Sequence, residues 1–245
     1  MTAVMYERLG FQERRPSPFS WRIRYAIAHK AIPIAFRTVR FADVETIRTL
    51  SGQDKVPILV DGEQVIHDSW NIALHLETRF PDRPSLFGGA TGRGLTRHIN
   101  HWSDTVLSPA IRRLISADFI WCLAPEDRPY FRRSREAAFG CTLEDYCADR
   151  ARWMAKLRTV IAPLEQTLSE QGFIGGTEPA YADYLVFSVF QYARLGCPLE
   201  LLAEDTAVRH WRDGLVARFD GLGDRYPRYP ATPEGPDVLN RDPTS

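Results

Sequence analysis

The stretch RRPSPFSWRIRYAIAHKAIPI, residues 14–34, carries a polar loop into a helix and then into an extended segment. Pro18 suits the first helical position, since its ring already holds a helical φ and its missing N–H would be unpaired there anyway. Apolar residues from Trp21 onward follow at nearly helical spacing, which predicts a helix over 18–30. Ser17 then falls at the cap, where unpaired backbone N–H groups and the positive end of the helix dipole face outward.

The segments around this helix alternate between strand and helix patterns. The sequence VPILVDGEQVIHD, residues 56–68, predicts two strands around an Asp61-Gly62 turn, and Pro81 stops the helix that follows. In chain order we expect a strand, a helix, a strand, a helix, the two-stranded hairpin and a helix at 3–8, 18–30, 34–41, 44–50, 56–68 and 69–80. The order β-α-β-α-β-β-α predicts a thioredoxin-like domain over residues 1–87.

The glycine-rich sequence FGGATGRG, residues 87–94, marks a change of composition, and we take 88–94 as a linker. Almost everything beyond it has helical periodicity, with helices expected at 95–122, 142–169, 181–195 and 206–218. We therefore expect an all-helical domain over 95–225 and an irregular, proline-rich tail over 226–245. The predicted fold class is an α/β thioredoxin-like domain followed by an all-α helical bundle.

Two local signals refine the second helix of this domain. Thr142 and Asp145 have the spacing of a capping box, with Asp145 where Glu or Gln is usual. Pro163 is expected to kink or interrupt the helix that Thr142 opens, because proline lacks the N–H that the helix needs.

Composition excludes several classes of protein. The 245 residues carry 31 Lys plus Arg and 31 Asp plus Glu, so the chain lacks the basic excess of a nucleic-acid binder. The four cysteines show no C-x-x-C spacing, which favours a reduced, cytoplasmic setting. No apolar run is long enough to span a membrane, and the N-terminus lacks a secretory pattern. A small molecule or another protein is the expected partner.

Over about its first 225 residues the chain resembles the cytosolic glutathione transferases. Within them, the motifs SPFSWR, HDSW and VRHWRDGLVARFDGLG are similar to an etherase-related class of bacterial β-aryl etherases and fungal enzymes. The resemblance implies glutathione as the cofactor, a homodimer, and a pocket for a small hydrophobic electrophile. It also places Asp183 at the family's interior aspartate, with Ala180 where a capping residue is expected.

Ser17 matches the catalytic serine of that class, and its predicted surroundings fit the role. Lowering a thiol pKa of about 8.5 by about two units takes roughly 2.7 kcal/mol. One hydrogen bond to a charged group contributes about 1.5–3 kcal/mol and a helix terminus about 0.3–2 kcal/mol, so the magnitudes agree. The alternatives are that Ser17 is an ordinary cap, or that Ser20, one turn further, is the thiolate donor.

The remaining glutathione contacts are implied by two other motifs. Val56-Pro57 matches the family's cis-proline before the third strand, which leaves the Val56 backbone for the cysteinyl residue of glutathione. Asp68-Ser69 matches an acidic residue followed by a serine, and a helix that begins at Ser69 suits the γ-glutamyl carboxylate. Plain strand initiation and plain helix capping are the alternatives. Gln53 and Lys55 are further candidates, for the glycine carboxylate.

The electrophile pocket is expected between the domains, along the loop before Ser17 and the first helix of the second domain. The candidate aromatic residues are Phe11, Phe19, Trp102, Phe119 and Tyr130, each of which suits the core equally well. His98 is a candidate for the pocket edge. It has His101 three residues later but no third ligand, so we expect no metal site. The arginines at 128, 132, 133 and 135 are expected on a solvated face or at an anionic substrate.

The expected reaction is attack of the glutathione thiolate on a hydrophobic, aromatic electrophile, with a β-aryl ether as the narrower expectation. A zeta-like glutathione-dependent isomerase is an alternative, although Phe19 replaces the cysteine of that class's signature. A non-catalytic ligand-binding protein of the same fold is a second alternative.

Overall fold

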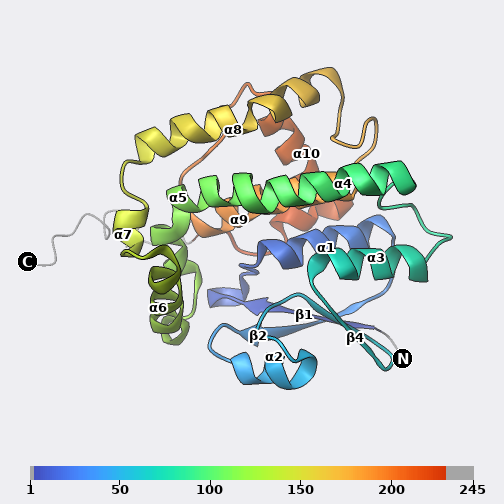
Figure 1. The fold of residues 1–245 in the computed structure, drawn as a ribbon, viewed down its shortest axis with the longest axis horizontal. Coiled ribbons are helices and arrows are strands. Elements are labelled where there is room, and N and C mark those ends of the chain that lie inside the picture. The colour runs from blue at the N-terminus through green and yellow to red at the C-terminus, as the bar shows by residue number, and fades with distance from the viewer. Residues whose placement is uncertain (1–2, 230–245) are drawn as a thin grey trace, which may run out of the picture.

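The N-terminal part of the computed structural model, which describes residues 3–229, is built on a four-stranded sheet of order β2-β1-β3-β4. Its elements are β1 (Val4–Leu9), α1 (Pro18–His29), β2 (Ala35–Arg40), α2 (Val44–Ser51), β3 (Ile58–Asp61), β4 (Gln64–His67) and α3 (Ser69–Arg79). Helices α1 and α3 cover one face of the sheet, and α2 covers the other (Figure 1). The predicted β-α-β-α-β-β-α order is confirmed.

The sheet is mixed, and its register fixes which chain segments meet at one edge. β1 runs parallel to β2 and antiparallel to β3, which pairs antiparallel with β4. Ile58 lies opposite both Tyr6 and His67. The predicted hairpin is confirmed, and Gly62 takes the left-handed conformation in its turn, with φ 64°.

The rest of the described chain is helical, as the predicted fold class requires. A nearly continuous helical run comprises α4 (Ala90–Trp102), a π-helical turn (Ser103–Leu107), α5 (Ser108–Phe119) and a 3-10 turn (Ile120–Cys122). A 3-10 turn (Pro125–Asp127), α6 (Arg128–Phe139), α7 (Leu143–Tyr146), α8 (Arg150–Glu170), α9 (Tyr181–Gly196), α10 (Ala207–Gly221) and a last 3-10 turn (Leu222–Asp224) follow. Backbone angles leave the helical region at residues 218–220, near the predicted end of the last helix.

The structure corrects four expectations. Helix α4 begins at Ala90, inside the segment taken as a linker. Thr142 does accept the N–H of Asp145, but it caps only the single turn of α7. The long helix α8 has its own cap, Asp149, and continues through Pro163 without interruption. Helix α6, where the arginine-rich run lies, was not predicted at all.

Helix α9 forms the centre of the molecule. Nearly all of its residues are buried, and α1 packs against it, so one apolar core runs through both domains. Asp183 in its first turn is fully buried and accepts hydrogen bonds from the N–H groups of Ile174, Gly175 and Ala180 and from the Trp211 indole. The interior aspartate therefore holds the helix start although Ala180 has no capping side chain.

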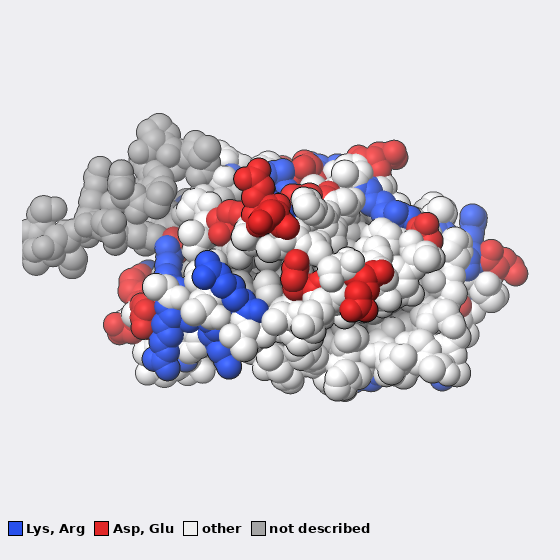
Figure 2. Space-filling view, turned by 90° about the horizontal axis from the view of Figure 1, so that it is seen from above, with Lys and Arg blue, Asp and Glu red and all other residues white. Residues whose placement is uncertain are grey.

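The surface carries no field of a single sign on the face seen in Figure 2, where positive and negative side chains are interspersed. None of the helices within residues 3–229 is both long and apolar enough to cross a membrane. Of the expected irregular tail, residues 230–245 lie outside the described part of the chain.

Candidate functional site

The sheet register gathers the predicted glutathione residues at one edge. Ile58 pairs with Tyr6 and His67, so Val56-Pro57 and Asp68-Ser69 lie next to the carboxyl end of β1. The loop that leaves this end of β1 leads directly to Ser17. The Arg8 guanidinium at the end of β1 also donates to the Asp54 carbonyl, 3.0 Å away, and ties the loop before Val56 to the same edge.

Ser17 is the N-cap of α1, as predicted. Its Oγ accepts a hydrogen bond from the Ser20 backbone N–H at 3.2 Å, and its side chain is almost completely buried. The Ser17 hydroxyl donates to no residue within 3–229, so its proton is available for a ligand. Pro18 follows at the first helical position, as expected from its fixed φ.

Ser20 lies inside the first turn with 1% of its surface exposed. Its Oγ is buried and has no hydrogen-bond partner in the described chain. A buried hydroxyl without a partner is uncommon, because its desolvation is uncompensated. Both serines thus keep an unused proton at the same helix end, but only the Ser17 Oγ is held in place by a hydrogen bond that it accepts from the backbone.

The Val56–Pro57 peptide bond is cis, as the resemblance implied. Val56 precedes the first β3 residue, so its backbone stands outside the ladder with β1. Gln53 does not project freely: its side-chain amide donates to Ser51 Oγ and the Lys55 carbonyl and accepts the Lys55 N–H. The expectation that Gln53 or Lys55 contacts the glycine carboxylate stays a prediction, and the Lys55 side chain is exposed.

Asp68, not Ser69, caps helix α3. The Asp68 carboxylate accepts the N–H groups of Trp70 at 2.9 Å and Asn71 at 3.3 Å, and its φ of 71° turns the chain into the helix. Ser69 is the first helical residue and is buried. The backbone N–H groups of Trp70 and Asn71 at this helix start are therefore already bound to Asp68 and are not free for the γ-glutamyl carboxylate. The Ser69 hydroxyl and backbone N–H remain for a ligand.

A hollow of about 520 Å³ lies between the two domains, beside the same loop. One side is formed by residues 9–13 and Arg40, and the other by residues 124–127 ahead of α6. We call it the interdomain hollow. Buried Asp127 joins its two sides by accepting the Ala42 N–H at 3.0 Å and by pairing with Arg40 at 3.5 Å.

The predicted aromatic pocket residues do not all lie in one place. Phe119 is corrected to a core residue: it is 1% exposed and packs between Phe131 and Tyr192. Phe11 lines the interdomain hollow, and Tyr130 lies exposed in the first turn of α6, just beyond Asp127.

The other pocket candidates are not among the residues that form the interdomain hollow. Phe19 is 41% exposed beside the guanidinium of Arg22, and Trp102 is partly buried against the core. His98 and His101 lie exposed on α4. Within the described chain, no group of three or more His, Cys, Asp or Glu residues is arranged to hold a metal ion.

Sequence reasoning missed a polar network that joins α1 to α4. Arg22, 1% exposed, donates to Asp104 at 2.6 Å, and Asn100 donates to the same carboxylate at 2.6 Å. Arg97 on the same helix stacks over Trp70, next to Ser69. The only sequence signal was the charged residue Arg22 on the apolar face of a predicted helix.

Two family models match the chain. One, described as the N-terminal domain of glutathione S-transferase, matches residues 13–84, and one described as its C-terminal domain matches residues 94–225. Glutathione S-transferase 1 of Dianthus caryophyllus is 34% identical over 74 residues, which are 29% of this chain and 34% of that relative. The match therefore spans about a third of the relative's length.

Solved structures show the same fold. Glutathione transferase GSTFuA3 from Phanerochaete chrysosporium superposes with a TM-score of 0.79 and 21% identity, over 90% of this chain and 97% of that chain. Glutathione S-transferase CsGST63524 of Ceriporiopsis subvermispora, solved in complex with glutathione, has a TM-score of 0.76 and 21% identity, over 93% and 99%.

Proposed function

The chain belongs to the glutathione S-transferase family, and from this premise we propose that it binds glutathione and activates its thiol through Ser17. In this proposal the Ser17 hydroxyl donates to the thiolate sulfur, which then attacks an electrophilic carbon. The sulfur supplies the nucleophile, while the protein supplies orientation and a lowered thiol pKa.

The observation that carries the proposal is the state of the α1 cap. Ser17 Oγ already accepts the Ser20 N–H, which holds the hydroxyl at the helix end and leaves its proton to point elsewhere. The cis Val56–Pro57 bond and the buried Ser69 lie at the same edge of the sheet. We assign the Val56 backbone to the cysteinyl residue, Ser69 to the γ-glutamyl carboxylate, and Asp68 to the same end of the tripeptide. Lys55 is assigned to the glycine carboxylate.

The proposed electrophile is hydrophobic and aromatic, and the interdomain hollow supports this part of the proposal. The hollow adjoins the loop that leads to Ser17, with Phe11 on its wall and Tyr130 near its rim. The narrower proposal is a β-aryl ether with a ketone next to the ether-bearing carbon. The ketone activates that carbon for displacement, and the phenolate of a phenol with a pKa of about 10 leaves without a strong acid.

Retention on immobilised glutathione, with elution by free glutathione, tests the cofactor assignment. We expect retention of the folded wild-type chain, and weaker retention of Ser69→Ala. A folded wild-type chain that passes through the column unbound would contradict glutathione binding.

Incubation with a fluorogenic β-aryl ether ketone tests the narrower substrate. We expect release of the phenol and a glutathione thioether only when glutathione is present. Turnover of a chlorinated aromatic electrophile without phenol release would leave the transferase activity standing and reject the ether as substrate.

The proposal also includes a homodimer in the cytoplasm. Leu95 and Val106 are exposed apolar residues on the run of α4 and the turn after it, 66% and 40% exposed, which supports a contact there. Light scattering after size-exclusion chromatography is expected to give twice the mass of one chain.

A further inference from the structure

Residues Leu222–Tyr229, here named the C-terminal strap, return to the loop that precedes Ser17. The strap starts directly after α10 and is firmly anchored at its beginning. The buried side chain of Gln191 donates to the Gly223 carbonyl at 2.6 Å, and a Cβ at Gly223 would meet the Val216 backbone at 2.8 Å. No larger residue fits this approach without a backbone shift.

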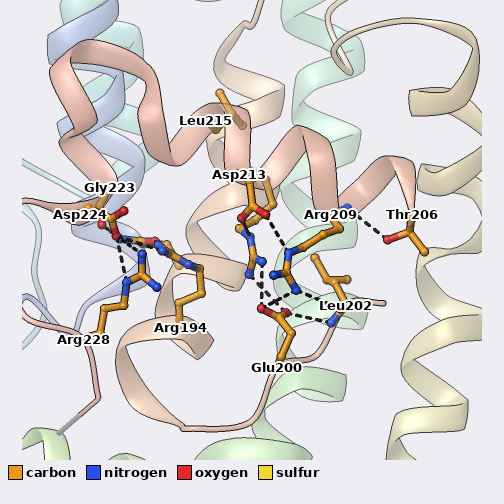
Figure 3. Close-up of polar contacts among 12 residues, drawn as sticks. Arg194, Glu200, Leu202, Thr206, Arg209, Asp213, Leu215, Gly223, Asp224 and Arg228 are labelled. Atoms are coloured by element: carbon orange, nitrogen blue, oxygen red, sulfur yellow. Dashed lines mark hydrogen bonds and ion pairs between the residues drawn. The ribbon is translucent and has the colours of Figure 1, made fainter. Parts of the chain in front are cut away.

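The next anchor of the strap is ionic. Asp224 accepts hydrogen bonds from Arg194 on α9 and from Arg228 further along the strap (Figure 3). Arg194 is held in turn by Gln191, the residue that binds the start of the strap. The strap is therefore fixed to the most buried helix of the molecule before it reaches the first domain.

Tyr226 carries the strap onto the segment just before Ser17. The guanidinium groups of Arg15 and Arg24 both lie against its ring, with 4.6 Å and 4.7 Å from their central carbons to the ring centroid. The ring also meets the edge of Trp21 at 6.0 Å. Both arginines pair with fully buried Glu7 on β1, so the ring closes a charged cluster inside the protein.

A second contact holds the same loop from the other side. The Arg14 guanidinium, 3% exposed, donates to the Arg228 carbonyl at 2.7 Å and to the Phe11 carbonyl at 2.8 Å. Gly10 at the start of the loop fits against the Cys122 carbonyl so closely that a Cβ would lie 2.6 Å from it. The loop therefore lies between the 3-10 turn that follows α5 and the strap.

The residues that contact Tyr226 are themselves connected to Ser17. The Trp21 indole, beside Tyr226, donates to the Arg15 carbonyl at 2.7 Å, and Pro16 alone separates Arg15 from Ser17. The backbone N–H of Trp21 also donates a hydrogen bond to the Ser17 carbonyl at 3.2 Å. A change in the position of the Tyr226 ring therefore reaches the capping residue through Arg15 and Trp21.

We propose that the C-terminal strap, through the Tyr226 ring, positions the Ser17 loop for thiolate binding, an inference that rests on the proposed role of Ser17. Tyr226 is a positioning residue: it acts through Arg15 and Trp21. Its hydroxyl has no hydrogen-bond partner in residues 3–229, so the aromatic ring is the part of the side chain that contacts Arg15, Arg24 and Trp21.

The test compares Tyr226→Leu with Tyr226→Phe in the full chain. Glu178→Ala serves as the matched control, because it removes an exposed pair with Arg218 outside the strap. Hydrogen exchange reports on the Gly10 and Arg14 amides, which are bonded inside the loop. The absorbance of the bound thiolate, titrated with pH, reports on the site.

We expect Tyr226→Leu to speed exchange of these amides and to lower kcat about tenfold, because small misplacements of a reacting group have large kinetic effects. The bound thiol pKa is expected to rise by about half a unit to one unit as part of the Ser17 hydrogen bond is lost. The KM for glutathione should stay within about threefold, because the proposed Val56 and Ser69 contacts are unchanged. Tyr226→Phe and Glu178→Ala should match the wild type.

Two results would overturn the positioning role. One is faster exchange in Tyr226→Leu with an unchanged thiol pKa and kcat, and the other is a Tyr226→Phe variant as impaired as Tyr226→Leu. If Tyr226→Leu does not fold, Asp224→Asn can be used instead, because it weakens the ionic contact of the strap with Arg194. It should change amide exchange and the thiol pKa in the same direction but by less. An absence of any change in Asp224→Asn would overturn the positioning role. A wild-type chain without a thiolate signal would instead reject the proposed function itself, before any variant is compared.

Discussion

The carboxyl end of α5 and the amino end of α1 offer opposite surroundings to a thiol. Near the end of α5 the thiols belong to the protein itself, and at the start of α1 the thiol is that of the proposed ligand. Near the end of α5, burial raises the pKa of Cys122 to about 12, and its thiol donates to the Leu195 carbonyl at 2.7 Å. Burial and the neighbouring Asp118 carboxylate raise the pKa of Cys197, which donates to that carboxylate at 2.9 Å. At the start of α1 a ligand meets a hydroxyl proton and the positive end of a helix instead.

The difference lies in what faces the sulfur. A thiol that faces acceptors in an apolar interior keeps its proton, because ionisation would lose a hydrogen bond and bury a charge. A sulfur that faces donors at a helix start is stabilised as the thiolate. On this account the protein suppresses its buried thiols and activates that of the proposed ligand.

The largest expected effect concerns the protein's own cysteines. Burial raises the Cys122 pKa to about 12, so hardly any of its thiolate forms near neutral pH. In the native protein we expect only Cys141, the one partly exposed cysteine, to react promptly with an aromatic disulfide reagent. The other three should react on unfolding. Prompt reaction of a second thiol in the folded state would contradict the comparison.

Ser17→Ala is expected to lower kcat about 10- to 100-fold, the equivalent of one hydrogen bond to a charged group. Glutathione affinity should change by no more than a few-fold, because the Val56 and Ser69 contacts remain. Steady-state kinetics with a chlorinated aromatic electrophile measures both. Ser17→Thr, which keeps a hydroxyl at the cap, is the matched control and should retain most of the rate. An unchanged kcat in folded Ser17→Ala would contradict the proposal that Ser17 donates a hydrogen bond to the thiolate.

Ser69→Ala is expected to weaken glutathione binding about three- to tenfold, since a neutral hydrogen bond contributes about 0.5–1.5 kcal/mol. The chemical step should hardly change, because this contact is present before and during the reaction. Calorimetric titration gives the dissociation constant. An unaltered dissociation constant would count against the carboxylate site at the start of α3.

The smallest effect is expected for Ser20→Ala. The Ser20 Oγ is buried without a partner in the described chain, so its removal deletes an uncompensated polar group. The free energy of unfolding should stay within about 0.5 kcal/mol or rise, and kcat should match the wild type. Urea unfolding and the same kinetic assay measure the two quantities. A large fall in kcat here would make Ser20 the donor.

Much of the fold could be predicted because local signals agree with each other. Pro18 after Ser17 fixes a helix start, and Asp61-Gly62 fixes a hairpin. Helix α6 escaped prediction because its charged residues obscure a narrow apolar face, on which only Phe131 is buried. Its arginines are partly used in the fold, as Arg132 pairs with Glu136 and Glu144.

Site details that depend on tertiary contacts could not be predicted. Asp68 and Ser69 are both good cap residues, and the positive φ at Asp68 decides between them. Phe119 is core because α9 passes so close that a Cβ at Gly196 would lie 2.3 Å from its ring. No local sequence pattern predicts the close contact between Gly196 and Phe119, or the contact between Tyr226 and Arg15, which lie far apart in the sequence.

The pKa of the bound glutathione thiol tests the central claim most directly. It is measured from thiolate absorbance as a function of pH, in the wild type, Ser17→Ala and Ser20→Ala. A lowered pKa means that the thiolate persists as pH falls below the ordinary thiol pKa of about 8.5. We expect a wild-type pKa about two units below that value, a rise of about one to two units in Ser17→Ala, and no change in Ser20→Ala. A wild-type pKa that is not lowered, or a rise in Ser20→Ala alone, would contradict activation by Ser17.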